Sequence, residues 1–139
     1  MRSFPAVVLA VGWALLLCAA GSMADHTPRT RLVPSGVWGG DHIRMEVTRD
    51  GAEIEFDCAR GTISRPLALD AQGRFRVQGT YRADTPAPMG ADGGSGAGAT
   101  YSGTVRGTTL RLEVSVAGQQ GARSFHLLRG QEGRLAKCA

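Results

Sequence analysis

The chain has 139 residues, 42% of them hydrophobic and 20% charged, and its formal net charge at pH 7 is +4. This length is enough for one folded domain and argues against an assembly of several. No basic run with interleaved aromatic residues is present, which argues against a nucleic-acid-binding protein.

Residues 1–24 have the composition of a secretory signal peptide. A single cation precedes the apolar run from Phe4 to Ala20, which is short for a membrane span, and small residues follow at Ser22 and Ala24. We predict cleavage after Ala24, export to the periplasm or the medium, and no transmembrane segment after cleavage. A lipoprotein anchored at Cys18 is the alternative, but Leu17 stands where that cleavage needs a small residue.

Cleavage would also change the cysteine count. Cys18 would be lost, and the remaining pair, Cys58 and Cys138, most simply forms one disulfide in an oxidising compartment. On the chain-entropy model, a bridge across about 80 residues contributes about 4 kcal/mol of stability. Because no Cys-x-x-Cys spacing is present, we expect a structural bond. Loss of Arg2 lowers the net charge from +4 to +3, which we interpret as an ordinary surface excess.

Residues 25–34 form a polar, proline-punctuated lead-in that we expect to be flexible. After it, apolar and polar residues alternate with the period of β-strands, and no stretch has a helical period. The clearest case is a hairpin with a two-residue turn at Asp50-Gly51. The register that this turn sets gives three inward pairs: Val47 with Ile54, Met45 with Phe56, and Ile43 with Cys58. Trp38 then has the wrong parity for the inner face, and a bulge at Gly39-Gly40 would correct it.

Further alternating segments follow along the chain. The predicted strands are Ile63–Leu69 (with Pro66 at an edge position), Phe75–Tyr81, Tyr101–Val105, Leu110–Val116, Phe125–Leu127 and a short last piece from Leu135 to Cys138. A three-residue loop with Gly73 in the left-handed conformation would place Leu69 opposite Phe75. Residues 83–99 are almost pure Gly, Ala, Pro and Asp, and we expect a long mobile loop there.

Consecutive antiparallel strands with one apolar face can hide that face by closing into a meander barrel. We therefore predict an all-β fold, a small up-and-down antiparallel β-barrel of seven or eight strands. The barrel would occupy residues 35–139 as a single domain.

Several polar groups are typical of chemistry, and we interpret each of them as surface. Glu46 and Glu55 would face each other at the spacing of a glycosidase pair, but on the solvated side of the sheet. The three histidines, including His42, lack the spacing of metal ligands. An outward arginine stripe, which we expect to be solubilising, consists of Arg74, Arg76 and Arg82. We therefore predict no catalysis, no metal and no cofactor.

One inward feature favours binding. If the strands that flank the long loop pair directly, Tyr81 faces Tyr101 and Gly79 faces Gly103. The glycines would either let the sheet coil tightly or leave a pocket beneath the tyrosines at the barrel mouth. Such a pocket would suit a small apolar or aromatic ligand.

The segment Gly36-Val37-Trp38 resembles the Gly-x-Trp signature of the calycins, the lipocalin and avidin group of ligand-binding barrels. The resemblance implies that Trp38 lies at the closed end of the barrel beneath an arginine from the last strand, here Arg129. A packed Arg129–Trp38 pair would be a cation–π contact worth about 0.5 to 2 kcal/mol.

A second resemblance covers nearly all of the chain after the predicted cleavage. The order of seven short segments resembles a group of small exported bacterial proteins of unassigned function. These segments are Trp38-Gly39-Gly40, His42-Ile43, Glu55–Ala59, Pro66-Leu67, Gly73–Phe75, Tyr101–Gly103 and Lys137-Cys138. The resemblance implies export and supports the Cys58–Cys138 pairing, and it implies no activity.

Two functions are consistent with these patterns. The first is a non-catalytic module that binds a small apolar ligand near Tyr81 and Tyr101. The second is a protein-interaction barrel, such as a protease inhibitor or an envelope accessory protein. A void beneath the tyrosines would favour the first, and a filled interior beside an exposed apolar patch on one rim would favour the second.

Overall fold

The structure is a computed structural model, and it describes residues 21, 29–84, 96–136 and 138. The predicted signal peptide (except Gly21), the lead-in up to Pro28 and residues 85–95 of the predicted loop lie outside this part of the chain. The described residues form strands and turns without a helix. The strands are β1 (Arg31–Leu32), β2 (Gly36–Gly40), β3 (Ile43–Val47), β4 (Ala52–Phe56), β5 (Ala59–Ile63), β6 (Ala68–Leu69), β7 (Arg74–Ala83), β8 (Ala97–Arg106), β9 (Thr109–Val116) and β10 (Arg123–Arg129).

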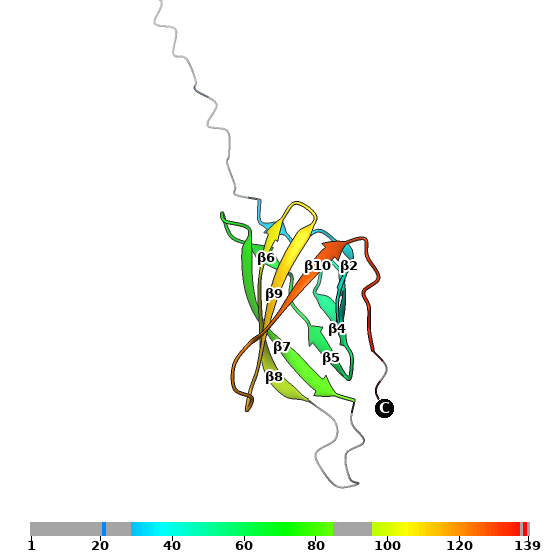
Figure 1. Ribbon diagram of the computed structural model, residues 1–139. Helices are drawn as coiled ribbons and strands as arrows, with labels where there is room; N and C mark the ends of the chain where they lie inside the picture. Colours follow the sequence, from blue (N-terminus) through cyan, green and yellow to red (C-terminus); the bar gives the residue numbers. More distant parts are fainter. Residues whose placement is uncertain (1–20, 22–28, 85–95, 137, 139) are drawn as a thin grey trace, which may run out of the picture.

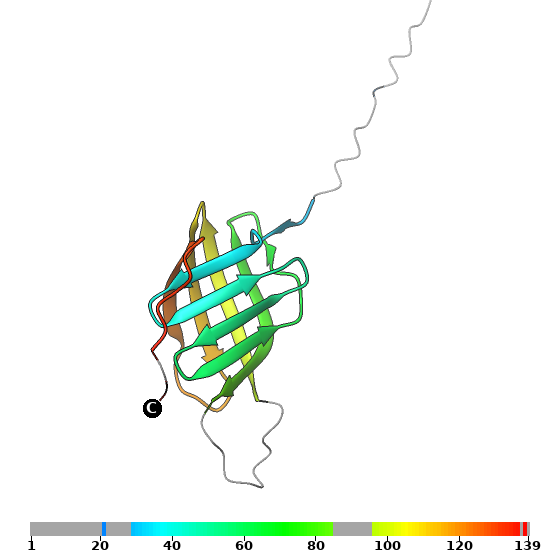
Figure 2. The same cartoon turned by 90° about the vertical axis from the view of Figure 1, so that its right-hand side faces the viewer.

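Eight of these strands close into an antiparallel barrel in the order β10-β2-β3-β4-β5-β7-β8-β9. Each barrel strand pairs with the barrel strands before and after it in the chain, so the predicted up-and-down barrel is confirmed. Figure 1 shows the barrel from the side of β7, β9 and β10, and Figure 2 shows β2 to β5 running across the front. The remaining strands, β1 and β6, form a separate two-stranded sheet.

The alternation of apolar residues produces the core, because neighbouring side chains along a strand point to opposite faces. Among the described residues no buried side chain is polar or charged, and no buried side-chain nitrogen or oxygen lacks a hydrogen bond. The largest fully buried side chains are Trp38, Tyr101, Ile43, Met45, Ile54, Leu67, Leu110, Leu112, Leu127, Val33 and Val114.

Trp38 reaches this core without the predicted bulge. The chain reverses at Asp41 and His42, so Trp38 and Ile43 lie on different strands and Trp38 pairs with Met45. His42 takes a positive φ of 67°, which a non-glycine residue adopts mainly in tight turns. Residues 36–56 therefore contain two hairpins, β2–β3 and β3–β4, where the sequence predicted only the second.

The second hairpin has a longer turn than predicted. Val47 pairs with Ala52, and the amide of Thr48 donates to the carbonyl of Gly51 across a four-residue loop. The register is thus shifted by two residues from the prediction, so Met45 faces Ile54. A shift of two preserves which face each side chain occupies, which is why the predicted inward side chains from Ile43 to Phe56 are confirmed. Gly51 is needed for a close approach, since a Cβ there would overlap the carbonyl of Ile63.

Three further expectations are corrected around β5. Cys58 is exposed in the turn between β4 and β5, so Ile43 pairs with Phe56 instead. The predicted strand from Ile63 to Leu69 is wrong, because Ile63 ends β5 and Leu69 belongs to β6. Gly73 has the predicted positive φ of 75°, yet Leu69 pairs with Arg31 and not with Phe75.

The lead-in is also more ordered than expected. Arg31 and Leu32 pair with β6, and the amide of Val33 donates to the carbonyl of Leu67 at 2.9 Å. Val33 is 2% exposed, so the end of the lead-in belongs to the core. The long loop is likewise shorter than predicted, because β7 extends to Ala83 and β8 begins at Ala97.

After β10 the chain returns along the β2–β3 hairpin, as Figure 2 shows in red. The amide of Arg134 donates to Gly40 and its carbonyl accepts from His42, at 2.9 and 2.7 Å. Gly39 allows this crossing, because a Cβ there would overlap the backbone of Gly133. The returning segment, which we call the tail (residues 130–138), ends at the Cys58–Cys138 disulfide, whose Cα atoms are 5.4 Å apart.

Candidate functional site

Four connections lie at one end of the barrel, because alternate turns of an up-and-down barrel share an end. They are the β2–β3 turn, the β4–β5 turn, the β7–β8 connection and the β9–β10 turn. We call this the loop end; it lies at the bottom of Figure 1. The sequence analysis placed its candidate ligand site here, at Tyr81 and Tyr101.

The two tyrosines do not face each other. The strands that flank the loop pair directly, as predicted, but Tyr81 pairs with Ala97 and Tyr101 pairs with Val77. Gly79 pairs with Ala99, and Gly103 pairs with Phe75. The register therefore differs by four residues from the predicted one, and it moves Tyr101 from the barrel mouth into the interior.

Tyr101 fills the space that the glycines were predicted to leave. It is 0% exposed, and its hydroxyl donates to the carbonyl of Thr80 at 2.6 Å. A Cβ on Gly61 would overlap that hydroxyl, and a Cβ on Gly79 would press on the ring. Burial raises the pKa of Tyr101, because the phenolate has no solvation there.

The space beside Gly103 is filled in the same way. A Cβ at this position would lie 2.7 Å from the ring of Phe75. Both inward glycines of the predicted ligand site thus accommodate core aromatic rings. Tyr81, half-buried on β7, remains near the surface of the loop end.

A cluster that the sequence analysis missed lies beside Tyr81. The rings of Phe56 and Tyr81 are 5.3 Å apart and those of Phe56 and Phe125 are 5.5 Å apart. The guanidinium of Arg123 lies 5.5 to 5.7 Å from the centroids of all three rings and donates to the Tyr81 hydroxyl at 3.0 Å. We call these four residues the Arg123 rim.

The position of Arg123 follows from strand parity. It begins β10 with the same parity as Phe125 and Leu127, whose side chains point inward. At the end of the barrel an inward position opens to solvent, so a long cationic side chain can lie over the core rings and keep its charge hydrated. The parity of Arg123, Phe125 and Leu127 was readable from the sequence, and it was the signal that could have found this residue.

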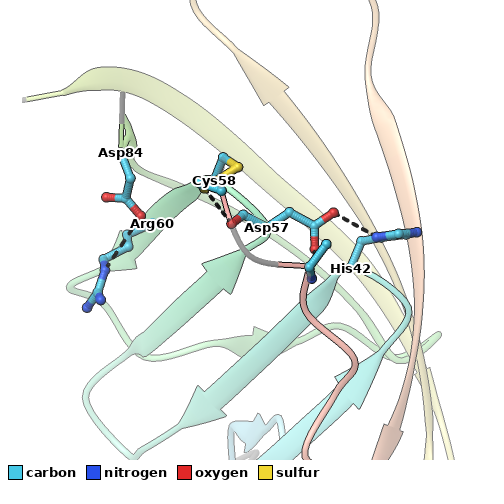
Figure 3. The surroundings of a disulfide bond; sticks show 7 residues. His42, Asp57, Cys58, Arg60 and Asp84 are labelled. Carbon is cyan, nitrogen blue, oxygen red and sulfur yellow. Dashed lines mark hydrogen bonds and ion pairs between the residues drawn. A yellow bond between two sulfur atoms is a disulfide. The ribbon is translucent and has the colours of Figure 1, made fainter. Parts of the chain in front are cut away.

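A second polar group at the loop end ties the tail to the barrel, as Figure 3 shows around the disulfide. The Asp57 carboxylate accepts from the Ala136 amide at 2.8 Å and contacts His42 Nδ1 at 2.7 Å. The pKa of Asp57 is lowered, mainly by the hydrogen bond from Ala136 and also by His42 and the charge of Arg123. This arrangement holds a strand turn and the tail together.

The other candidate groups do not assemble into a site. Glu46 pairs with Glu53, while Glu55 lies between Arg44 and Arg60 on the outer face, so the predicted Glu46–Glu55 pair is wrong. Within residues 29–84 and 96–136, no group of three or more histidine, cysteine or carboxylate residues could hold a metal ion. In the same part of the chain, no helix has the length and apolar character of a membrane span.

The predicted Trp38–Arg129 pair is adjacent but differs in its contact. The two residues are register partners on β2 and β10, and the Trp38 indole donates to the carbonyl of Pro34 at 2.9 Å. Arg129 donates to the carbonyl of Ser35 at 3.0 Å. The cation–π contacts among the described residues belong to Arg123. Arg129 instead holds the residue before β2 by its hydrogen bond to Ser35.

Comparison with known proteins found no match, neither to a family model, nor to a curated protein, nor to a solved structure.

Proposed function

We propose that this chain is a non-catalytic binding module that recognises a protein partner through the Arg123 rim. The observation that carries the proposal is the position of the Arg123 guanidinium over Phe56, Tyr81 and Phe125. Arginine and tyrosine dominate the binding energy of many protein interfaces. A guanidinium already held against rings loses little conformational freedom when it pairs with a carboxylate.

The packing of the interior supports a surface site over an enclosed one. An eight-stranded barrel has room either for its own side chains or for one small ligand. Trp38, Tyr101 and Leu112 are 0% exposed and belong to one continuous core. A filled interior is the first of the two conditions that would favour the protein-interaction barrel. The second, an exposed apolar patch on one rim, is not met by the Arg123 rim, because Phe56 is 6% exposed.

The same three rings support a second candidate, a small aromatic anion that rests on Phe56 and Phe125. Its charged group would pair with Arg123, which would have to swing outward. This candidate keeps the small aromatic ligand expected from the sequence but places it at the rim. Either function uses Arg123, so one set of variants tests both.

The test is chemical crosslinking in the cells that produce the protein. We expect one partner protein to be recovered with the natural chain and with Arg49→Ala, and about tenfold less of it with Arg123→Ala. Arg49 lies in the β3–β4 turn at the opposite end of the barrel, and its replacement by alanine removes the same charge. Equal recovery with both variants would contradict the proposal, as would a loss with Arg49→Ala.

Native mass spectrometry of the same samples separates the two candidates. A small molecule that accompanies the natural chain and is lost with Arg123→Ala would replace the protein partner by the aromatic anion. The variant Arg123→Lys, with thermal melting as a check of folding, retains the charge but lacks the planar guanidinium. Recovery by the Lys variant at the level of the natural chain would contradict a role for the stacked guanidinium.

A further inference from the structure

The outer face of β7, β8 and β9 has a groove on the side of the barrel, away from the Arg123 rim. Its floor is β8, where short side chains alternate with inward ones. The groove has a volume of about 430 Å³ and is lined by Arg74, Phe75, Ser102, Gly103, Thr104, Arg111 and Glu113. From the sequence alone, Arg74 was predicted only to be part of a solubilising stripe.

Strand register places two arginines on either side of one threonine. Arg74 pairs with Thr104 across β7 and β8, and Thr104 pairs with Arg111 across β8 and β9. Adjacent strands are about 4.8 Å apart, so the Cα atoms of the two arginines lie about 10 Å apart. Long side chains that rise from these positions can converge above the shorter threonine, which lies between them.

The next row supplies a second hydroxyl. Ser102 lies between Arg76 and Glu113, so the floor of the groove contains the hydroxyls of Ser102 and Thr104. Both side chains are half-buried. Hydroxyls and guanidinium groups together donate hydrogen bonds in several directions, which is the pattern that a tetrahedral oxyanion accepts.

The lining of the groove has two cations, Arg74 and Arg111, and one anion, Glu113. Arg74 contacts the Asp70 carboxylate at 3.5 Å, and this contact uses its Nε atom. Arg111 has no salt bridge with the other described residues. Three further acidic residues, Glu46, Glu53 and Glu55, lie on the outer face of β3 and β4. Because cations outnumber anions in its lining, we call this groove the basic groove.

We propose that this groove binds a phosphate or sulfate group between Arg74 and Arg111, over the hydroxyls of Ser102 and Thr104. The charge of the group would balance two guanidinium groups from residues that strand pairing places on either side of Thr104. The planar forks of both arginines match oxyanion geometry. The site is separate from the Arg123 rim, so it stands or falls independently of the proposed function.

The test is titration of the isotope-labelled full chain with inorganic phosphate, followed by nuclear magnetic resonance of the Ser102, Thr104 and arginine N–H signals. We expect saturable shifts confined to the groove, and binding at least about tenfold weaker for Arg74→Ala with Arg111→Ala. The control is Arg49→Ala with Arg65→Ala, which removes the same charge from exposed positions outside the groove. Arg111→Ala alone is included, because it leaves the Arg74–Asp70 contact intact.

Glucose 6-phosphate and vesicles of phosphatidylcholine with phosphatidic acid distinguish the source of the phosphate. Binding of either probe that is weakened by Arg111→Ala supports the site and assigns it to a free sugar phosphate or to a lipid headgroup. Equal weakening by the control pair would show general charge attraction and overturn the proposal. Shifts that do not saturate, or that spread over the whole barrel, would overturn it as well.

Discussion

At the scale of single residues, the positions of two glycines and one tyrosine explain how the interior of the barrel is filled. Gly61 and Gly79 have no side chain where the Tyr101 ring passes, and the Tyr101 hydroxyl is bonded to Thr80. The sequence analysis recognised that inward glycines make room, but it could not assign what fills the room. Tyr101 fills the space because the β7–β8 register differs by four residues from the predicted one, in which Tyr81 faces Tyr101. Side-chain parity alone does not distinguish these two registers.

This packing predicts a rescue between two substitutions. Gly61→Ala should destabilise the barrel by about 1 to 3 kcal/mol, because the new methyl overlaps the Tyr101 hydroxyl. Adding Tyr101→Phe removes that hydroxyl. The double variant should therefore lose less free energy of unfolding than the two single variants lose together. Denaturant unfolding of the four proteins measures the coupling.

The matched control for this cycle is Gly79→Ala. A Cβ there overlaps the Thr62 carbonyl as well as touching the ring, so Tyr101→Phe should not restore its stability. If the effects of Gly61→Ala and Tyr101→Phe were simply additive, the position of the hydroxyl described here would be wrong.

At the scale of elements, face and order were predictable, while register and strand ends were not. Met45, Ile54 and Phe56 lie inward as predicted, because alternation is a property of neighbouring residues. The predicted two-residue turn at Asp50-Gly51 was wrong. Gly51 is needed instead because its backbone packs closely against the carbonyl of Ile63, which belongs to the next hairpin. The strand Ala59–Ile63 was missed because two of its three inward positions hold small residues, Ala59 and Gly61. Arg123 was missed because a charged residue was not expected at an inward position.

The tail gives a pH-dependent prediction at this scale. The lowered pKa of Asp57 means that its contact with the Ala136 amide stabilises the docked tail above the ordinary value of 3.8. This stabilisation should be lost as the pH falls through the lowered pKa, when the carboxylate is protonated. Asp57→Asn should therefore increase amide hydrogen exchange at Ala136 near neutral pH, and it should abolish the change that acid causes in the natural chain.

The disulfide allows this experiment to isolate the carboxylate, because Cys58–Cys138 keeps the tail tethered in both proteins. The amide of Arg134, which donates to Gly40, is the internal reference. Equal exchange at Ala136 in the variant and the natural chain would mean that Asp57 does not hold the tail.

At the scale of the whole molecule, the barrel combines a filled interior with polar features on its outside. The loop end has the Arg123 rim, the side of β7 to β9 has the basic groove, and the tail crosses the β2–β3 hairpin. The sequence predicted the barrel and the cysteine pair, since both depend on patterns along the chain. It did not predict the two proposed surface sites, which depend on how distant strands lie side by side.

The central claim is that the protein's own side chains fill the interior, so that the proposed binding occurs outside it. Methyl-labelled spectra of Met45, Leu110 and Leu112, recorded during titration with a fatty acid, retinol and indole, test it most directly. We expect these methyl signals to stay unchanged up to saturating ligand, because each of the three side chains is 0% exposed within one continuous core. Saturable shifts at these methyl groups would show a ligand inside the barrel and would contradict the account.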